Sequence, residues 1–297
     1  MTHSTLFTPL PAYQLRHNHK TLELSVPQVM GILNVTPDSF SDGGRFVQVD
    51  KALAHVQAMI DDGASIIDIG AESTRPNAQA VSDDEQLVRL SQVVSAIRQS
   101  FGDIWISIDT SSPVVMAQMH KLGADIWNDV RGLTQQGAVQ MAAALEVPVV
   151  IMHARGEPDT MNQLAHYENV CAEVIKELGV RIDNALQAGV KRDNIIIDVG
   201  MGFAKNFEHH KEIMRNLTAF MQLGYPMLFG VSRKRFLGEV LTHTGLKKYQ
   251  NHAINERDGV GAAAGLLAVQ QGASIIRTHQ VADVVQALAL WQQLSAD

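Results

Sequence analysis

Three polar residues with complementary chemistry each end a short apolar run of this chain. Asp109 follows IWISI, Asn128 follows ADIW and Asp198 follows NIII. A buried carboxylate needs a hydrogen-bond donor, and a flat heterocycle with an amino group beside a ring N–H offers two donors side by side. The Asn128 amide both donates and accepts, so it suits the adjacent edge of such a ring. Each residue alone is equally well explained as a helix cap, but the three together favour a heterocycle site.

A set of cations follows other apolar runs. Its members are Arg75, Arg233, Lys234, Arg235, Arg277 and His279. Barrels of alternating strands and helices often bind phosphate at the loops after strands seven and eight, which favours a diphosphate cradle here. Arg277 and His279 are two residues apart and share a face if the strand continues that far. The SRKR run also suits a solvated patch or a nuclear-targeting segment, but its place directly after a buried run favours the anion site.

The loop that begins at Asn34, NVTPDSFSDGG, combines an amide with two acids, Asp38 and Asp42. Mg²⁺ takes oxygen ligands and is usually shared between one or two protein groups, water and substrate phosphates. We therefore predict Asn34 as a Mg²⁺ ligand. Asp38 and Asp42 are equally well explained as turn residues that bond to their own backbone.

Of three further patterns, the first favours a ligand contact and the other two have simpler interpretations. In Gly200–Phe203 the glycines allow a ligand to approach the backbone, and the phenyl ring would cover a ring face. The run 259–265 resembles a dinucleotide fingerprint, but its third glycine is one residue late and no strand precedes it, so a small-residue helix face is predicted. The histidines of HNH (17–19) and EHH (208–210) lack metal-ligand spacing and are predicted to be exposed.

Apolar, β-branched runs alternate with helical stretches from about residue 26 onward. Strands are predicted near 27–34, 65–69, 104–109, 125–128, 148–152, 194–198, 226–231 and 273–277, and their ends also include Asp68 and His153. A doubly wound open sheet would show the same alternation, but eight fairly even units favour a closed barrel with its site at the carboxyl ends of the strands. We predict an α/β protein with a single TIM (β/α)8 barrel domain over residues 26–297 and an N-terminal extension over residues 1–25.

The composition narrows the function class. The 297 residues are 46% hydrophobic and 19% charged, with a net charge of −7, which argues against a general nucleic-acid surface. No stretch reaches the roughly 18 apolar residues of a membrane helix, and the first residues do not resemble a secretory signal. The single cysteine, Cys171, permits no internal disulfide. We therefore expect a soluble protein of the reducing cytoplasm.

The chain resembles the dihydropteroate synthases, a family of folate-pathway enzymes, from about Val29 to the final helix. The matching motifs are GILNVTPDSFSDGG, IIDIGAESTRP, SIDTS, WNDVRG, VVIMH, IIIDVGMGF, GVSRKRFLG and IRTH. The resemblance implies the same barrel, a homodimer and Mg²⁺ as cofactor. The implied reaction condenses 6-hydroxymethyl-7,8-dihydropterin diphosphate with p-aminobenzoate to 7,8-dihydropteroate and diphosphate, and sulfonamides would compete with p-aminobenzoate.

The family pattern implies three groups of site residues. The pterin-binding residues are Asp109, Asn128, Met152, Asp198, Phe203 and Lys234. The residues for anionic substrate parts are Thr74, Arg75, Arg277, Thr278 and His279, and Asn34 carries the Mg²⁺ bound to the diphosphate. The residues of the p-aminobenzoate pocket and catalytic loops are Thr36, Pro37, Phe40, Asp42, Pro76 and Ser232. The chain departs from the pattern at Asn77, where many members have glycine, and at Gln280, where aspartate is common.

Two other functions compete with this interpretation. A methyltransferase of the same pterin-binding family, which moves a methyl group from methyltetrahydrofolate to a corrinoid protein, would share the carboxylates and the asparagine. It would not obviously need SRKR, the Arg277–His279 pair or the TPDSFSDGG loop. A non-catalytic pterin-binding paralogue would be expected to have lost loop or anion-site residues, and all of them are present. The sequence therefore favours the synthase.

Overall fold

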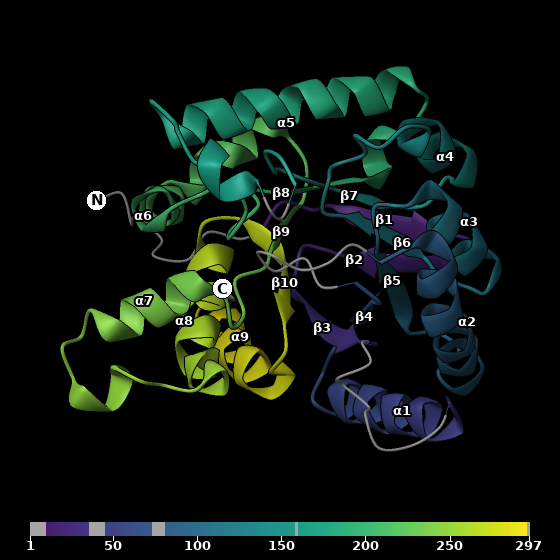
Figure 1. Cartoon of the computed structure of the whole chain (residues 1–297), viewed down its shortest axis with the longest axis horizontal. Coiled ribbons are helices and arrows are strands. Elements are labelled where there is room, and N and C mark those ends of the chain that lie inside the picture. Colours follow the sequence, from purple (N-terminus) through teal and green to yellow (C-terminus); the bar gives the residue numbers. More distant parts are fainter. Residues whose placement is uncertain (1–9, 36–44, 73–80, 158–159, 296–297) are drawn as a thin grey trace.

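Eight parallel strands close into a barrel in the computed structural model, which describes residues 10–35, 45–72, 81–157 and 160–295 (Figure 1). The barrel strands are β3 (Gln28–Asn34), β4 (Ile66–Gly70), β5 (Trp105–Asp109), β6 (Ile126–Asp129), β7 (Val149–Met152), β8 (Ile195–Asp198), β9 (Met227–Phe229) and β10 (Ala273–Thr278). They follow chain order around the barrel, and β10 pairs with β3 to close it. The predicted barrel is confirmed, and closure excludes the doubly wound open sheet.

Helices surround the strands and bury their outer faces (Figure 1). They are α1 (Arg45–Asp61), α2 (Asp83–Ser100), α3 (Pro113–Lys121), α4 (Ala138–Leu145), α5 (Val170–Gln187), α6 (Phe207–Arg215), α7 (Arg235–Thr242), α8 (Asp258–Gln270) and α9 (Val281–Ser295). The predicted small-residue helix face is confirmed in α8, where a Cβ at Gly265 would lie 3.1 Å from Ile276 on β10. None of the helices within the described ranges has the length and apolar character to cross a membrane.

The inside of the barrel is built from the two-residue repeat of its strands. One apolar residue from the first half of each strand joins a single buried cluster, and these residues are Met30, Ile66, Trp105, Ile126, Val150, Ile196, Leu228 and Ile275. Because side chains two positions apart share a face of a strand, the next inward position of each strand lies nearer its carboxyl end. The apolar cluster thus forms a floor, and the positions beyond it form the wall of the barrel mouth.

An N-terminal hairpin covers the floor from outside. Its strands β1 (Gln14–His17) and β2 (Lys20–Glu23) are antiparallel, and Leu15 and Leu24 join the floor cluster with no exposed surface. Lys20 Nζ lies 2.8 Å from Asp125 Oδ2 beside β6, with both side chains nearly buried. The hairpin thus closes the amino end of the barrel, leaving the carboxyl end for chemistry.

The prediction that the histidines are exposed is wrong for two of them. His17 is buried because β1 turns it toward the barrel, where its ring meets that of His120 edge to face. His210 is buried because it lies on the inner side of α6, where its Nε2 accepts a hydrogen bond of 2.9 Å from the Gly202 amide. Sequence spacing excluded a metal motif but carried no information on these two packing positions.

We expect Leu15→Ala to lower the free energy of unfolding by roughly 2–5 kcal/mol, because it opens a cavity in the fully buried floor. Leu246→Ala is the matched control: Leu246 is 58% exposed, so its removal should change stability by less than about 0.5 kcal/mol. Urea titration followed by circular dichroism measures both. Equal stability of the two variants would contradict the sealing role of the hairpin.

Candidate functional site

The barrel mouth is lined by residues that stand two positions beyond the floor. Asp68 follows Ile66, Asn128 follows Ile126 and Asp198 follows Ile196, each with an apolar residue of the outer face between them. The same step places Ser107, Met152 and Arg277 at the mouth. Most of the strand-end residues picked out in the sequence therefore converge, because all eight strands run in the same direction. The prediction is wrong for His153, which lies one position past the inward Met152 and contacts Glu177 on α5 instead.

A buried ion-pair cluster occupies the centre of the mouth. The Arg277 guanidinium donates from Nε to Asp68 Oδ2 at 2.6 Å and from Nη2 to Asp109 Oδ2 at 2.8 Å. Asn128 Nδ2 donates to the same Asp68 oxygen at 3.1 Å, and Ser107 Oγ donates to Oδ1 at 2.6 Å. Arg277 thus lies among the carboxylates and joins β10 to β4 and β5.

Asp68 was picked out in the sequence only as a strand end, without an assigned role, and its partner Ser107 was not picked out at all. Asp68 is fully buried and contacts Arg277, Asn128 and Ser107, so it orients the arginine and the amide together. Its place at the end of an apolar run did mark Asp68, but the local sequence carried no information on its three partners.

Burial shifts the titration of the mouth residues. It raises the pKa of Asp109 to about 7 against the opposing charge of Arg277, and it also raises the pKa of Asp198 against that of Lys234. Burial lowers the pKa of Lys234 to about 8 although Asp198 is near. Because the pKa values of Asp109 and Lys234 are close to neutral pH, these groups can gain or lose a proton when a charged ligand binds.

A flat apolar surface adjoins Asp198. Met152 and Phe203 belong to one small buried cluster, and Lys234 Nζ lies 4.9 Å from the centre of the Phe203 ring. Lys234 Nζ also donates a hydrogen bond to the carbonyl oxygen of Met201. The Asp198 carboxylate can bind the polar edge of a planar ring, while the Met152 sulfur and the Phe203 ring contact its faces.

The SRKR run does not form one cation cradle. Arg233 pairs with Asp258 on α8 through two hydrogen bonds of 2.8 Å, and Arg235 pairs with Glu239 on α7 at 2.6 Å. Arg235 Nε and its carboxylate partner are one helical turn apart on an exposed face, which explains its outward direction. Of the three cations, Lys234 is the one beside the mouth.

The ends of β9 and β10 are joined by a serine and a histidine. Ser232 Oγ lies 3.0 Å from His279 Nδ1 and accepts a hydrogen bond of 3.1 Å from the His279 amide. Strand β10 ends at Thr278, so His279 lies one residue beyond it. The Thr278 hydroxyl exchanges hydrogen bonds with the backbone of Gln280 at the turn into α9.

Some predicted residues lie outside the described residues. They are Thr36, Pro37, Asp38, Phe40, Asp42, Thr74, Arg75, Pro76 and Asn77. Asn34 is described: it ends β3 opposite Gly70 and lies four positions beyond Met30 of the floor, so it faces the mouth. Within the described ranges there is no group of three or more His, Cys, Asp or Glu side chains that could hold a metal ion.

The comparisons with known proteins agree with this geometry. A family model described as "Pterin binding enzyme" matches residues 30–279. The dihydropteroate synthase of Haemophilus influenzae is 47% identical over 279 residues, covering 94% of this chain and 98% of that protein. The structure of the Xanthomonas albilineans dihydropteroate synthase with 4-aminobenzoic acid is similar with a TM-score of 0.88 and 40% sequence identity. The match covers 97% of this chain and 100% of that chain. The structure of a Yersinia pestis dihydropteroate synthase with a sulfonamide drug complex is similar with a TM-score of 0.86 and 38% sequence identity. The match covers 94% of this chain and 98% of that chain.

We expect Gly200→Ala to disrupt the mouth, because a Cβ there would lie 1.8 Å from the His153 carbonyl oxygen and φ is +68°. The loss of stability should exceed the roughly 1–2 kcal/mol of the left-handed backbone alone. Gly179→Ala inside α5 is the matched control, since nothing lies within 4 Å of its Cβ position and a helical alanine gains up to about 1 kcal/mol. Thermal unfolding measures both, and a Gly200→Ala variant as stable as wild type would contradict the close approach.

Proposed function

This chain belongs to the pterin-binding enzyme family and within it to the dihydropteroate synthases, and from that membership we propose that it performs the condensation that gives the family its name. The substrates are 6-hydroxymethyl-7,8-dihydropterin diphosphate and p-aminobenzoate, and the products are 7,8-dihydropteroate and diphosphate. The observation that carries the proposal is the convergence of Asp198, Asn128 and Arg277 on one barrel mouth beside Lys234.

The pterin ring binds with its amino edge toward the strand-end acids and amide. Asp198 and Asn128 pair with the amino group and ring N–H, and Asp109 completes the polar edge through its contact with Arg277. Met152 and Phe203 cover the ring faces, and Lys234 contributes a cation beside them. Lys234 is well placed for this role because its Nζ is already fixed by Met201 and Phe203.

The reacting end of the substrate lies toward the ends of β9 and β10. The C–O bond between the pterin methylene and the diphosphate breaks, and the electron-rich ring spreads the positive charge that develops. Arg277, His279, Thr278 and the loop residues Thr74 and Arg75 stabilise the departing negative charge, which is electrostatic catalysis by fixed groups. The arylamine nitrogen then forms the C–N bond and loses a proton, so no covalent enzyme intermediate is needed.

The donor chemistry at the mouth fits Mg²⁺. Asn34 is at an inward position of β3 and carries an amide oxygen, and Mg²⁺ commonly takes one or two protein ligands and completes its shell with water and phosphate oxygens. Asn34 would therefore hold the ion against the diphosphate. When bound there, Mg²⁺ supplies positive charge that neutralises the leaving group.

The p-aminobenzoate site is assigned to Ser232 and to the two loops after β3 and β4. The loop residues are Thr36, Pro37, Phe40, Asp42 and Pro76. Sulfonamides compete there because they share the arylamine group.

A homodimer is the assembly we infer for this chain. Helices α8 and α9 pack against each other and carry large exposed apolar side chains, with Leu267 52% exposed, Leu290 58% and Leu294 53%. Such side chains on neighbouring helices favour burial against a second copy.

The proposed activity is tested by incubation with dihydropterin diphosphate, p-aminobenzoate and Mg²⁺, with dihydropteroate and diphosphate both quantified. We expect stoichiometric formation of the two products. Asp198→Asn should lower kcat/KM for the pterin substrate by on the order of a hundredfold, since it removes a charged hydrogen-bond acceptor. Absence of both products with saturating substrates would defeat the proposal.

The charge of Lys234 predicts a pH dependence. Its pKa of about 8 means that the free enzyme carries the ammonium below pH 8 and loses it as the pH rises. We therefore expect kcat/KM for the pterin diphosphate to fall above about pH 8, because kcat/KM reports the free enzyme. In Lys234→Arg this descending limb should vanish, since arginine stays charged. A limb of the same midpoint in the variant would assign it to another group.

A further inference from the structure

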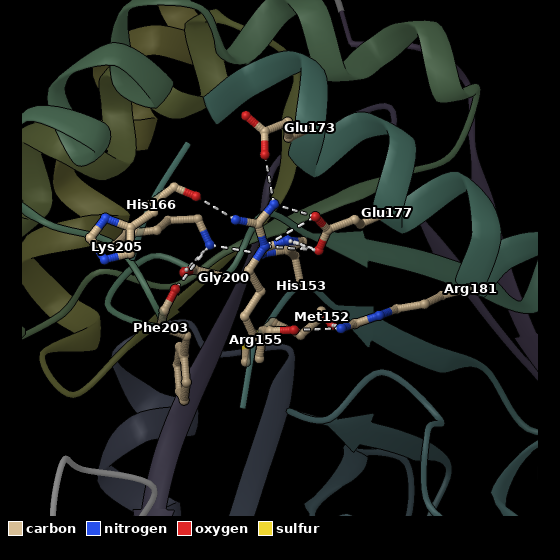
Figure 2. Close-up of polar contacts among 11 residues, drawn as sticks. Met152, His153, Arg155, His166, Glu173, Glu177, Arg181, Gly200, Phe203 and Lys205 are labelled. Atoms are coloured by element: carbon tan, nitrogen blue, oxygen red, sulfur yellow. Dashed lines mark hydrogen bonds and ion pairs between the residues drawn. The ribbon is translucent and has the colours of Figure 1, made fainter. Parts of the chain in front are cut away.

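A second buried lysine lies beneath the mouth and is not used by the mechanism above. Lys205 is 7% exposed and ends the loop that follows β8. Its Nζ lies 2.9 Å from His153 Nδ1, 3.1 Å from the Gly200 carbonyl oxygen and 3.1 Å from the Phe203 carbonyl oxygen (Figure 2). An ammonium group has three N–H donors, so these three acceptors match its full capacity.

The histidine contact fixes one tautomer. Burial lowers the pKa of Lys205 to about 7 although Asp198 is near, so the ammonium form is present below that pH. In this form the group donates and cannot accept, so His153 Nδ1 is the acceptor and the ring proton is on Nε2. Nε2 then donates to Glu177 Oε2 at 3.0 Å. Burial and the nearby Lys205 charge lower the pKa of His153 to about 3, so the ring is neutral and the tautomer persists.

Helix α5 anchors the far end of this network. Arg155 donates to Glu177 and to Glu173, and its guanidinium stacks on the Tyr167 ring at 3.9 Å. The hydrogen bond from His153 and the contact with Arg155 lower the pKa of Glu177 to about 2, so the carboxylate stays ionised. The path from α5 through Glu177 and His153 to Lys205 is continuous in Figure 2.

The loop held by Lys205 is the one that contacts Lys234. Its two bonded carbonyls, at Gly200 and Phe203, bracket the Met201 carbonyl oxygen that accepts from Lys234. The loop also supplies the Phe203 ring beside Lys234, and the Gly200 amide donates to Asp198 at 2.7 Å. With φ of +68° at Gly200 and +89° at Gly202, the loop backbone has no intrinsic preference for this shape and needs outside contacts.

We propose that Lys205 is a positioning residue for the pterin subsite: its three hydrogen bonds hold the loop 200–204 so that Met201 and Phe203 fix the Lys234 ammonium beside Asp198. This inference rests on the proposed function, in which Lys234 and Asp198 bind the pterin. Lys205 acts through Lys234 and takes no part in the chemistry.

The first test is Lys205→Met, which keeps the length and apolar stem but removes the donors. We expect the KM for dihydropterin diphosphate to rise by on the order of ten- to a hundredfold, the range typical when a hydrogen-bond partner that orients a metal ligand is removed. The KM for p-aminobenzoate and kcat should change by less than about threefold. Lys191→Met is the control, because Lys191 is exposed and its pair with Glu146 lies at the surface.

A double-mutant cycle separates positioning from general damage. If Lys205 acts mainly through Lys234, Lys205→Met should raise the pterin KM by a clearly smaller factor in Lys234→Ala than in the wild type. Effects that multiply in the double variant would overturn the proposal, as would an unchanged pterin KM in Lys205→Met.

A second variant and a binding assay keep the test decisive. Glu177→Gln removes the charge that anchors His153 at a site partly open to solvent, so it should weaken pterin binding in the same direction even if Lys205→Met fails to fold. Calorimetric titration with 6-hydroxymethylpterin measures this without turnover, and wild-type affinity in Glu177→Gln would contradict the network. Wild-type protein that binds this pterin but makes no dihydropteroate would contradict the proposed function alone, while the titrations would still decide the role of Lys205.

Discussion

The candidate site depends on the ion pair that Arg277 makes with Asp68 and Asp109 inside the barrel. Removing any one partner would leave an unpaired charge in a place with little solvent, which is far more costly than losing a surface pair. The same ion pair also orients Asn128, because Asp68 accepts a hydrogen bond from the Asn128 amide as well. One guanidinium therefore sets the direction of two acids and, through one of them, an amide.

This arrangement is possible because the barrel separates two environments along each strand. The floor is apolar and closed by Leu15 and Leu24, so it can carry packing without polar atoms. Most of the next inward positions are polar, and four of them satisfy one another, as buried polar groups must: Asp68, Ser107, Asn128 and Arg277. Stability and chemistry thus occupy successive layers of the same strands, and the two-residue repeat assigns each residue to its layer.

The sequence predicted the closed barrel, the positions of its eight strands within a few residues, and most of the mouth. These predictions were possible because the end of each apolar run marks the carboxyl end of a strand. The sequence could not predict the partner of a charged side chain. Arg233 and Arg235 turn to Asp258 and Glu239 on neighbouring helices, which depends on tertiary packing. The burial of Lys205 could not be predicted from the sequence either, because burial is predicted from the periodicity of apolar residues and a loop around a lysine has none.

The hairpin that covers the floor has a consequence for how the chain assembles. Lys20 and its partner Asp125 are 105 positions apart, and Leu15 belongs to a buried cluster that includes one residue from every barrel strand, the last of them Ile275. During synthesis the β1–β2 hairpin leaves the ribosome before most of the barrel strands. It can therefore pack against the floor only after all eight strands have assembled. Contacts of such long sequence separation form slowly, so we expect the seal at the amino end to be among the last parts of the molecule to become protected.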